Sequence, residues 1–97
     1  MDAASSRNQL SEHLARVADG DRQALGAVYR DTSAKLFGVC LRILGDRGEA
    51  EDVLQEVYLT VWNKAAAFDA SRASPITWLV AIARNRAIDR LRAGGLA

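Results

Sequence analysis

Hydrophobic residues recur along most of the chain at the three- and four-residue spacing of an amphipathic helix. The spacing is clear over about 7–18 and resumes over about 22–44. A third stretch covers about 47–66 and a fourth about 75–92. No segment alternates between apolar and polar residues as a half-buried strand does. The pattern therefore predicts an all-α fold, a compact bundle of about four helices.

Residues with strong terminal preferences mark where the first three helices begin and end. Ser5 or Ser6 is the predicted N-cap of the first helix, and Asp21 that of the second. Asp19-Gly20 and Gly45 are the predicted stops, because glycine tolerates the left-handed conformation that ends many helices. The third helix is then expected to begin directly after this second glycine.

The second half of the chain has its own boundary signals. Residues 68–74 form a predicted loop, and Ser74 followed by Pro75 predicts the start of the fourth helix. Gly94-Gly95 predicts its end, with residues 1–93 as one domain and 94–97 as the start of a linker. Within the second helix, the weak helix formers Asp31-Thr32-Ser33 predict a break.

Charge divides the chain more sharply than its total suggests. The 97 residues carry a formal net charge of +1, but residues 46–69 have a local net charge of −4 and residues 70–97 one of +4. An acidic block followed by a basic block indicates two surfaces with different partners. The alternative is that the two blocks pair with each other.

Several classes of function lack the residues they need. Cys40 is the only cysteine and His13 the only histidine, so neither a disulfide nor a metal site is expected, and Cys40 is predicted to lie in the core. There is no paired-carboxylate site, Ser/His/Asp set or Gly-rich phosphate loop, so no enzyme activity and no cofactor are expected. Without a long apolar stretch or a signal peptide, the chain is predicted to be cytoplasmic, with no membrane partner.

The predicted third helix has two stripes of side chains. The core side is formed by Ala50, Val53, Leu54, Val57 and Val61. Roughly opposite lie Asp52, Glu56, Leu59 and Asn63, flanked by Gln55 and Trp62. A mixed acidic and apolar stripe suits docking against a basic protein surface. The alternative is that Leu59 and Trp62 pack under the first or second helix.

The predicted fourth helix also has more than one face. Its core side is formed by Ile76, Leu79, Val80, Ala83 and Ala87, extended by Leu91. A second stripe holds Trp78, Ile82, Asn85 and Asp89, with Arg84, Arg86, Arg90 and Arg92 around the rest. Arginines neutralise phosphates, Asn reads base edges and Trp stacks on unpaired bases, which favours contact with partly single-stranded DNA. The alternative is a solvated arginine-rich helix with Trp78 half-buried.

The last two helical segments resemble a known family. Residues 46–62, from Asp46 through Asp52, Gln55 and Glu56 to Trp62, are similar to the D-x-x-Q-E-x-F/Y-x-x-x-W stretch of sigma factors. Residues 75–92 are similar to the T-W-L-x-x-I-A-x-N-x-x-x-D-x-x-R run that follows it. The resemblance covers about residues 10–93 and is strongest to the extracytoplasmic-function group, at its first conserved domain, sigma region 2.

The resemblance implies that the third helix docks on RNA polymerase core. In such factors this helix binds the clamp helices of the β′ subunit. The implied core-polymerase-binding residues are Asp52, Gln55, Glu56, Leu59, Trp62 and Asn63.

The resemblance also implies that the loop and the fourth helix read promoter DNA, as the single-stranded non-template minus-ten element. The implied DNA-binding residues are Arg72, Ser74, Trp78, Arg84, Asn85 and Arg86, and the arginine pattern adds Arg90. An anti-sigma factor is a further implied partner, and the second domain of such factors, which reads the minus-thirty-five element, is absent.

Two other functions remain open at this point. A helix-turn-helix regulator of double-stranded DNA needs a short turn before its recognition helix, and the seven-residue loop 68–74 is long for that. A protein-interaction bundle without a DNA role leaves Asn85 and the arginines without a partner.

Overall fold

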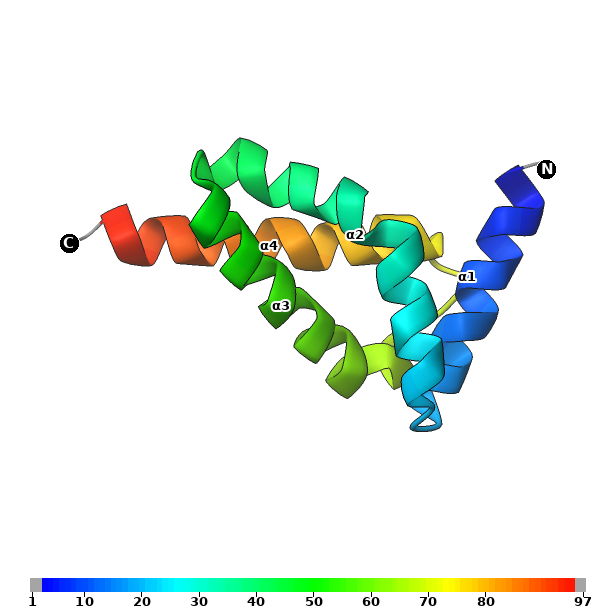
Figure 1. Cartoon of the computed structure of the whole chain (residues 1–97). Coiled ribbons are helices and arrows are strands. Elements are labelled where there is room, and N and C mark those ends of the chain that lie inside the picture. Colours follow the sequence, from blue (N-terminus) through cyan, green and yellow to red (C-terminus); the bar gives the residue numbers. More distant parts are fainter. Residues whose placement is uncertain (1–2, 96–97) are drawn as a thin grey trace.

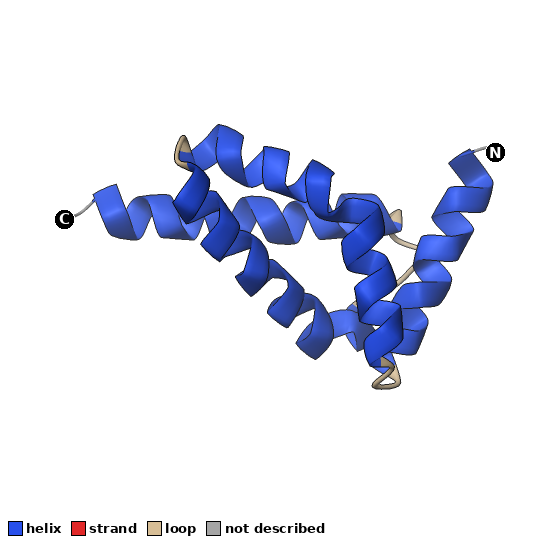
Figure 2. Ribbon diagram, viewed as in Figure 1, coloured by secondary structure: helices blue, strands red, loops and turns tan. Residues whose placement is uncertain are grey.

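A computed structural model describes the backbone of residues 3–95 and the side chains of residues 8–94. This part of the chain contains four α-helices, one short 3₁₀-helix and no strand (Figure 2), so the predicted all-α bundle is confirmed. The elements are α1 (Ala3–Ala18), α2 (Arg22–Leu44), α3 (Arg47–Lys64), η1 (Ala65–Ala67) and α4 (Pro75–Gly95).

The cap residues act as their chemistry predicts. Asp21 caps α2 by accepting hydrogen bonds from the backbone N–H groups of Gln23 and Ala24. Gly45 ends α2 in the left-handed conformation, with φ of 70°, and its N–H donates to the carbonyl of Leu41. Asp46 then caps α3, because it accepts a hydrogen bond from the N–H of Glu49 at 2.9 Å.

Three boundaries differ from the predicted ones. Helix α1 begins at Ala3, so Ser5 and Ser6 lie inside it and the prediction that one of them is its N-cap was wrong. Helix α3 ends at Lys64 and continues as η1. Helix α4 reaches Gly95, so the first half of the expected linker is helical and residues 96–97 lie outside the described residues.

Helix α2 is continuous through Asp31-Thr32-Ser33, where a break was predicted, but it bends about midway along its length (Figure 1). About midway along α2, the buried Thr32 hydroxyl donates to the carbonyl of Val28 at 2.6 Å. Side-chain bonds of this kind compete with the helix ladder and often accompany a bend. The same Thr32 oxygen lies 2.6 Å from the hydroxyl of Tyr58 on α3, so the bend is tied to the neighbouring helix.

The bend lets α2 contact all three of the other α-helices. Figure 1 shows its second half running alongside α4, while α3 crosses in front of α4 and α1 stands at the far end. The core between them contains the fully buried Leu14, Val28, Leu36, Cys40, Val53, Val57, Val61 and Leu79. Cys40 is fully buried, which confirms the core position predicted for it, and this burial raises the pKa of its thiol. Leu91 is 48% exposed, so its assignment to the core side of α4 was wrong.

Candidate functional site

The outer stripe of α3 faces away from the core. Its residues Asp52, Gln55 and Asn63 are exposed, and Leu59 is 64% exposed, the largest exposed fraction among the big apolar side chains described. The alternative that Leu59 packs under another helix is therefore wrong. Trp62 is different, because it is half-buried and packs against the core. The stripe thus presents an exposed carboxylate, Asp52, and an exposed leucine, Leu59, about two helical turns apart on the same helix.

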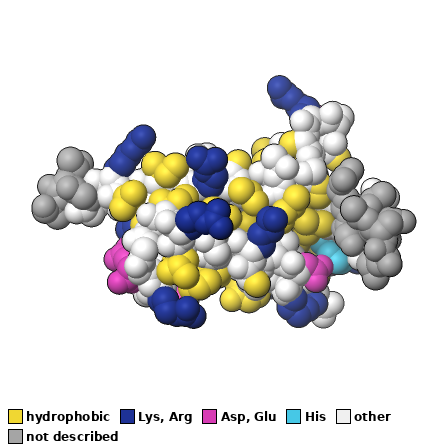
Figure 3. All heavy atoms as spheres, turned by 90° about the horizontal axis from the view of Figure 1, so that it is seen from above, with side chains coloured by type: hydrophobic (Ala, Val, Ile, Leu, Met, Phe, Trp, Pro, Cys, Tyr) yellow, Lys and Arg dark blue, Asp and Glu magenta, His cyan; other side chains and the backbone are white. Residues whose placement is uncertain are grey.

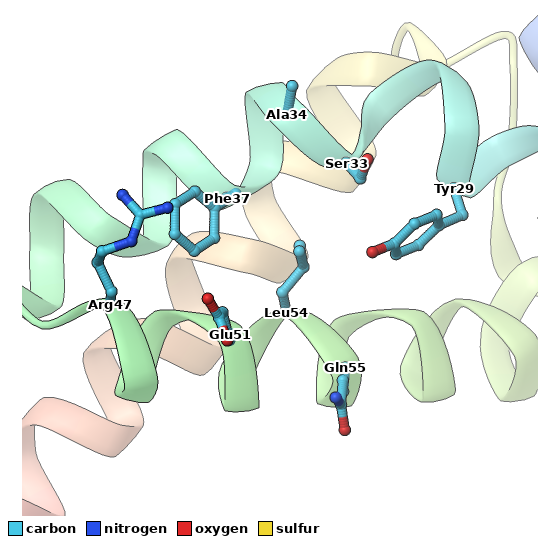
Figure 4. A pocket seen from close by; sticks show the side chains of 8 residues that line it. All are labelled: Tyr29, Ser33, Ala34, Phe37, Arg47, Glu51, Leu54 and Gln55. Carbon is cyan, nitrogen blue, oxygen red and sulfur yellow. The ribbon is translucent and has the colours of Figure 1, made fainter.

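An open groove lies along one side of this stripe, between α2 and α3 (Figure 4). Its volume is about 400 Å³, and it is lined by Tyr29, Ser33, Ala34 and Phe37 from α2 and by Arg47, Glu51, Leu54 and Gln55 from α3. At one end the Arg47 guanidinium lies over the Phe37 ring, 5.3 Å from its centroid. Only Gln55 among these residues was predicted as a site residue. The others were missed because the periodicity of a single helix does not indicate a groove between two helices.

The predicted DNA-binding residues differ in how far they are exposed. Arg72, Arg84 and Asn85 are exposed. Trp78 is half-buried, with its ring centroid 5.4 Å from that of Phe68 at the start of the loop. Ser74 is used as the N-cap of α4, since its oxygen accepts a hydrogen bond from the N–H of Thr77 and its hydroxyl donates to the Thr77 oxygen.

The loop before α4 has internal structure. Asp69 accepts hydrogen bonds from the hydroxyl and the backbone N–H of Ser71, at 2.6 and 2.9 Å. These two bonds, the hydroxyl bond first, hold the pKa of the Asp69 carboxyl below its usual value. The loop is thereby turned next to the Phe68–Trp78 pair.

The remaining predicted residues meet each other across the α3–α4 boundary. Two different nitrogens of Arg90 donate to Glu49 at 2.7 Å and to Glu56 at 2.6 Å. Arg86 donates to the Thr60 hydroxyl at 2.8 Å and lies 3.9 Å from the other Glu56 oxygen. The carboxylates, Glu49 first, raise the pKa of Arg90 above its usual value. We call these five side chains the α3–α4 clasp.

The clasp shows that the acidic and basic blocks do pair, but only in part. Sequence periodicity assigned Glu56 to one surface and both arginines to another, and the structure brings them together. Asp52, Glu51 and Arg84 form no ion pair with any side chain that the structure describes. Outside the clasp, α3 exposes Glu51 and Asp52 together with Arg47 and Lys64, and α4 exposes Arg84 and Arg92 together with Asp89.

On the surface seen from above in Figure 3, the charged side chains are more often basic than acidic, and they are scattered among apolar and uncharged polar groups. Over residues 3–95, none of the helices is both long enough and apolar enough to cross a bilayer. Nor do three potential metal-ligating side chains of the described residues come together. What the site offers is exposed charge, exposed apolar groups and two aromatic pairs, Phe68–Trp78 at the loop and Tyr29–Tyr58 at the groove.

A comparison with protein families decides what these surfaces belong to. The family described as Sigma-70 region 2 matches residues 28–96, which include the bend of α2 and all of α3 and α4. The chain belongs to the Sigma-70 region 2 family. The predicted resemblance is thereby confirmed, and the helix-turn-helix and adaptor alternatives find no support.

Curated relatives of this sigma region 2 chain carry the name "ECF RNA polymerase sigma factor SigK". The protein of that name from Mycobacterium ulcerans is 40% identical over 86 residues, which cover 89% of this chain and 46% of that protein. The one from Mycolicibacterium vanbaalenii is 42% identical over 84 residues, covering 87% of this chain and 43% of that protein. The chain thus spans about half the length of the curated relatives it matches.

Proposed function

We propose that this sigma region 2 chain docks on RNA polymerase core through α3 and recognises and melts the minus-ten promoter element through α4 and the loop before it. The observation that carries the proposal is the exposed outer stripe of α3, in a chain of this family. Leu59 is 64% exposed on the same stripe as Asp52, which has no ion pair with a described side chain, so both side chains are available to a partner.

For docking, the stripe supplies both kinds of contact that a specific interface uses. Leu59 is an apolar anchor, and Asp52 is a charge that selects a basic partner. We assign the β′ clamp helices as that partner, contacted by Asp52, Gln55, Glu56, Leu59, Trp62 and Asn63. The groove beside Gln55 adds apolar surface at the edge of the same stripe.

For DNA, α4 and its loop supply exposed arginines beside an aromatic pair. Arg72 and Arg84 are free to contact phosphates, and Asn85 is free to contact a base edge. Trp78 lies at the start of α4, next to the loop, where an extruded non-template base would stack. Flipping a base costs a few kcal/mol, so we expect weak DNA binding by this chain without the polymerase.

Further partners follow from the same assignment. An anti-sigma factor is the kind of protein that we expect to cover these surfaces when the factor is inactive. We place the protein in the cytoplasm with the polymerase and assign it no catalytic step. We assign the promoter-specificity role to a whole factor of the length of these relatives, which are about twice as long as this chain.

The docking assignment is tested with the double variant Asp52→Ala/Leu59→Ala. Both side chains are exposed and outside the clasp, so we expect an unchanged melting temperature and at least about ten-fold weaker binding to core polymerase. The matched control is Asp31→Ala/Leu91→Ala, which removes an exposed acid and an exposed leucine from α2 and α4. Equal affinities of the two variants in a pull-down titration would show that α3 is not the docking surface.

A further inference from the structure

The clasp between α3 and α4 contains residues from both predicted surfaces. Arg90 holds two carboxylates of α3 at once, and Arg86 holds Thr60 and faces the second oxygen of Glu56. Both oxygens of the Glu56 carboxylate therefore face an arginine. Glu49, Glu56 and Thr60 lie seven and four residues apart, on the flank of α3 nearest α4.

From these contacts we infer that Arg90, supported by Arg86, is a positioning residue of the α3 docking surface and not a DNA contact. The inference rests on the proposed function, since it concerns the same α3 surface. It also revises the grouping of Arg86 and Arg90 with the DNA-binding residues.

The first reason is the cost of moving Arg90 to a phosphate. Its guanidinium would have to give up two short charge-assisted hydrogen bonds. A phosphate that approached Arg90 in place would also lie near the Glu49 and Glu56 carboxylates, which repel it. Arg84, by contrast, is exposed and has no ion pair with a described side chain.

The second reason is the direction of the side chains around α4. At about 100° per residue, Arg84 is about 120° around the helix from Arg90. Arg90 therefore points to the α3 flank while Arg84 points away from it. A DNA strand lying along the exposed side of α4 meets Arg84 and not Arg90.

The third reason is what the clasp does to Glu56. A surface glutamate normally samples several rotamers, and ordering it on binding weakens affinity. Arg90 holds Glu56 in one position, yet the carboxylate side chain is still 40% exposed and has lone pairs left to accept a hydrogen bond from a partner. The clasp thus preorganises a docking group beside Asp52 and Leu59.

The inference is tested with Arg90→Ala and Arg84→Ala in the present chain, titrated separately with core polymerase and with single-stranded DNA. We expect Arg90→Ala to weaken core binding about three- to ten-fold and to leave DNA affinity and its salt dependence unchanged. Arg84→Ala should do the reverse. A loss of DNA affinity in Arg90→Ala, with core binding intact, would overturn the inference, and so would no change in either affinity.

The variant Glu49→Gln distinguishes a positioning role of Arg90 from a merely structural one. It loosens the clasp at Glu49 and leaves Arg90 and Glu56 in place. We expect a smaller loss of core affinity with DNA affinity unchanged. Core and DNA affinities that fall in parallel with the melting temperature would also overturn the inference. Asp52→Ala is the reference for the proposed function. If it weakens core binding while Arg90→Ala does not, only this inference fails, and if neither does, the docking surface itself is wrong.

Discussion

A buried pair of hydroxyl groups joins the bend of α2 to α3. The Thr32 hydroxyl donates to the Val28 carbonyl, and the Tyr58 hydroxyl then donates to the Thr32 oxygen. Both side chains are less than 10% exposed, and burial raises the pKa of Tyr58 to about 12. Each polar group in this relay has a partner, as buried polar groups require.

At the residue scale, the relay predicts unequal costs for removing its two hydroxyls. Tyr58→Phe leaves Thr32 bonded to Val28 and should cost about 1 kcal/mol of unfolding free energy. Thr32→Val leaves the Tyr58 hydroxyl buried without a partner and should cost more, about 1–3 kcal/mol. Urea denaturation of both variants measures the difference. The combined variant should lose less than the sum, and strict additivity would contradict the coupling.

The helix ends show how local chemistry positions whole elements. Gly45 ends α2 and is followed at once by the Asp46 cap of α3, so the direction of α3 is set within two residues. This turn places the start of α3 next to the end of α2. The groove and the docking stripe both depend on it.

At the element scale, a glycine inside α2 and the glycine that caps its end predict opposite effects of alanine. Gly45→Ala places a Cβ at φ of +70°, which should destabilise the fold by about 1–2 kcal/mol. Gly38 lies within the helix with no atom near the position of a new Cβ, so Gly38→Ala should stabilise by about 0.5–1 kcal/mol. Thermal melting of the two variants checks the signs. A loss of stability in Gly38→Ala would contradict the open space described around it.

The whole molecule uses one set of charges internally, because the clasp pairs Glu49 and Glu56 with Arg86 and Arg90. The exposed charges outside the clasp are mixed on both elements. On α3 they are Glu51, Asp52, Arg47 and Lys64, and on α4 and its loop they are Arg72, Arg84, Arg92, Asp69 and Asp89. Under the proposed function, we expect a protein partner and a nucleic acid to contact different faces of the chain, so that both can be bound at the same time.

At the scale of the molecule, we predict that the chain binds single-stranded non-template minus-ten DNA more tightly than duplex of the same sequence. Arg84→Ala should reduce the slope of log affinity against log salt by about 0.7, as loss of one phosphate contact on a single strand does. Arg22→Ala, another exposed arginine at the start of α2, is the matched control with an unchanged slope. Fluorescence anisotropy over a salt series measures both. Tighter binding to the duplex would favour a double-stranded DNA binder instead.

The sequence by itself determined the helices and most of the core. Helical periodicity located all four, and the caps at Asp21, Gly45 and Ser74 are where the residue types predicted them. These features depend on interactions between residues that are close in the sequence, so the sequence alone predicts them. The outward direction of Asp52 and Leu59 was also readable, because it follows from the position of the core stripe on the same helix.

Only the tertiary structure decided what lies between helices. The groove of Tyr29, Phe37 and Leu54 exists because α2 and α3 diverge, and periodicity along one helix does not contain that spacing. The clasp likewise joins residues 34 and 41 positions apart, so Glu56 and Arg90 seemed to belong to separate surfaces until the packing brought them together. A break was predicted at Asp31-Thr32-Ser33 because these residues are weak helix formers. The helix instead continues through them, and the bond of Thr32 to Tyr58 on α3 is a contact that the sequence pattern does not contain. Contacts between helices, rather than local preference, determined where these side chains lie.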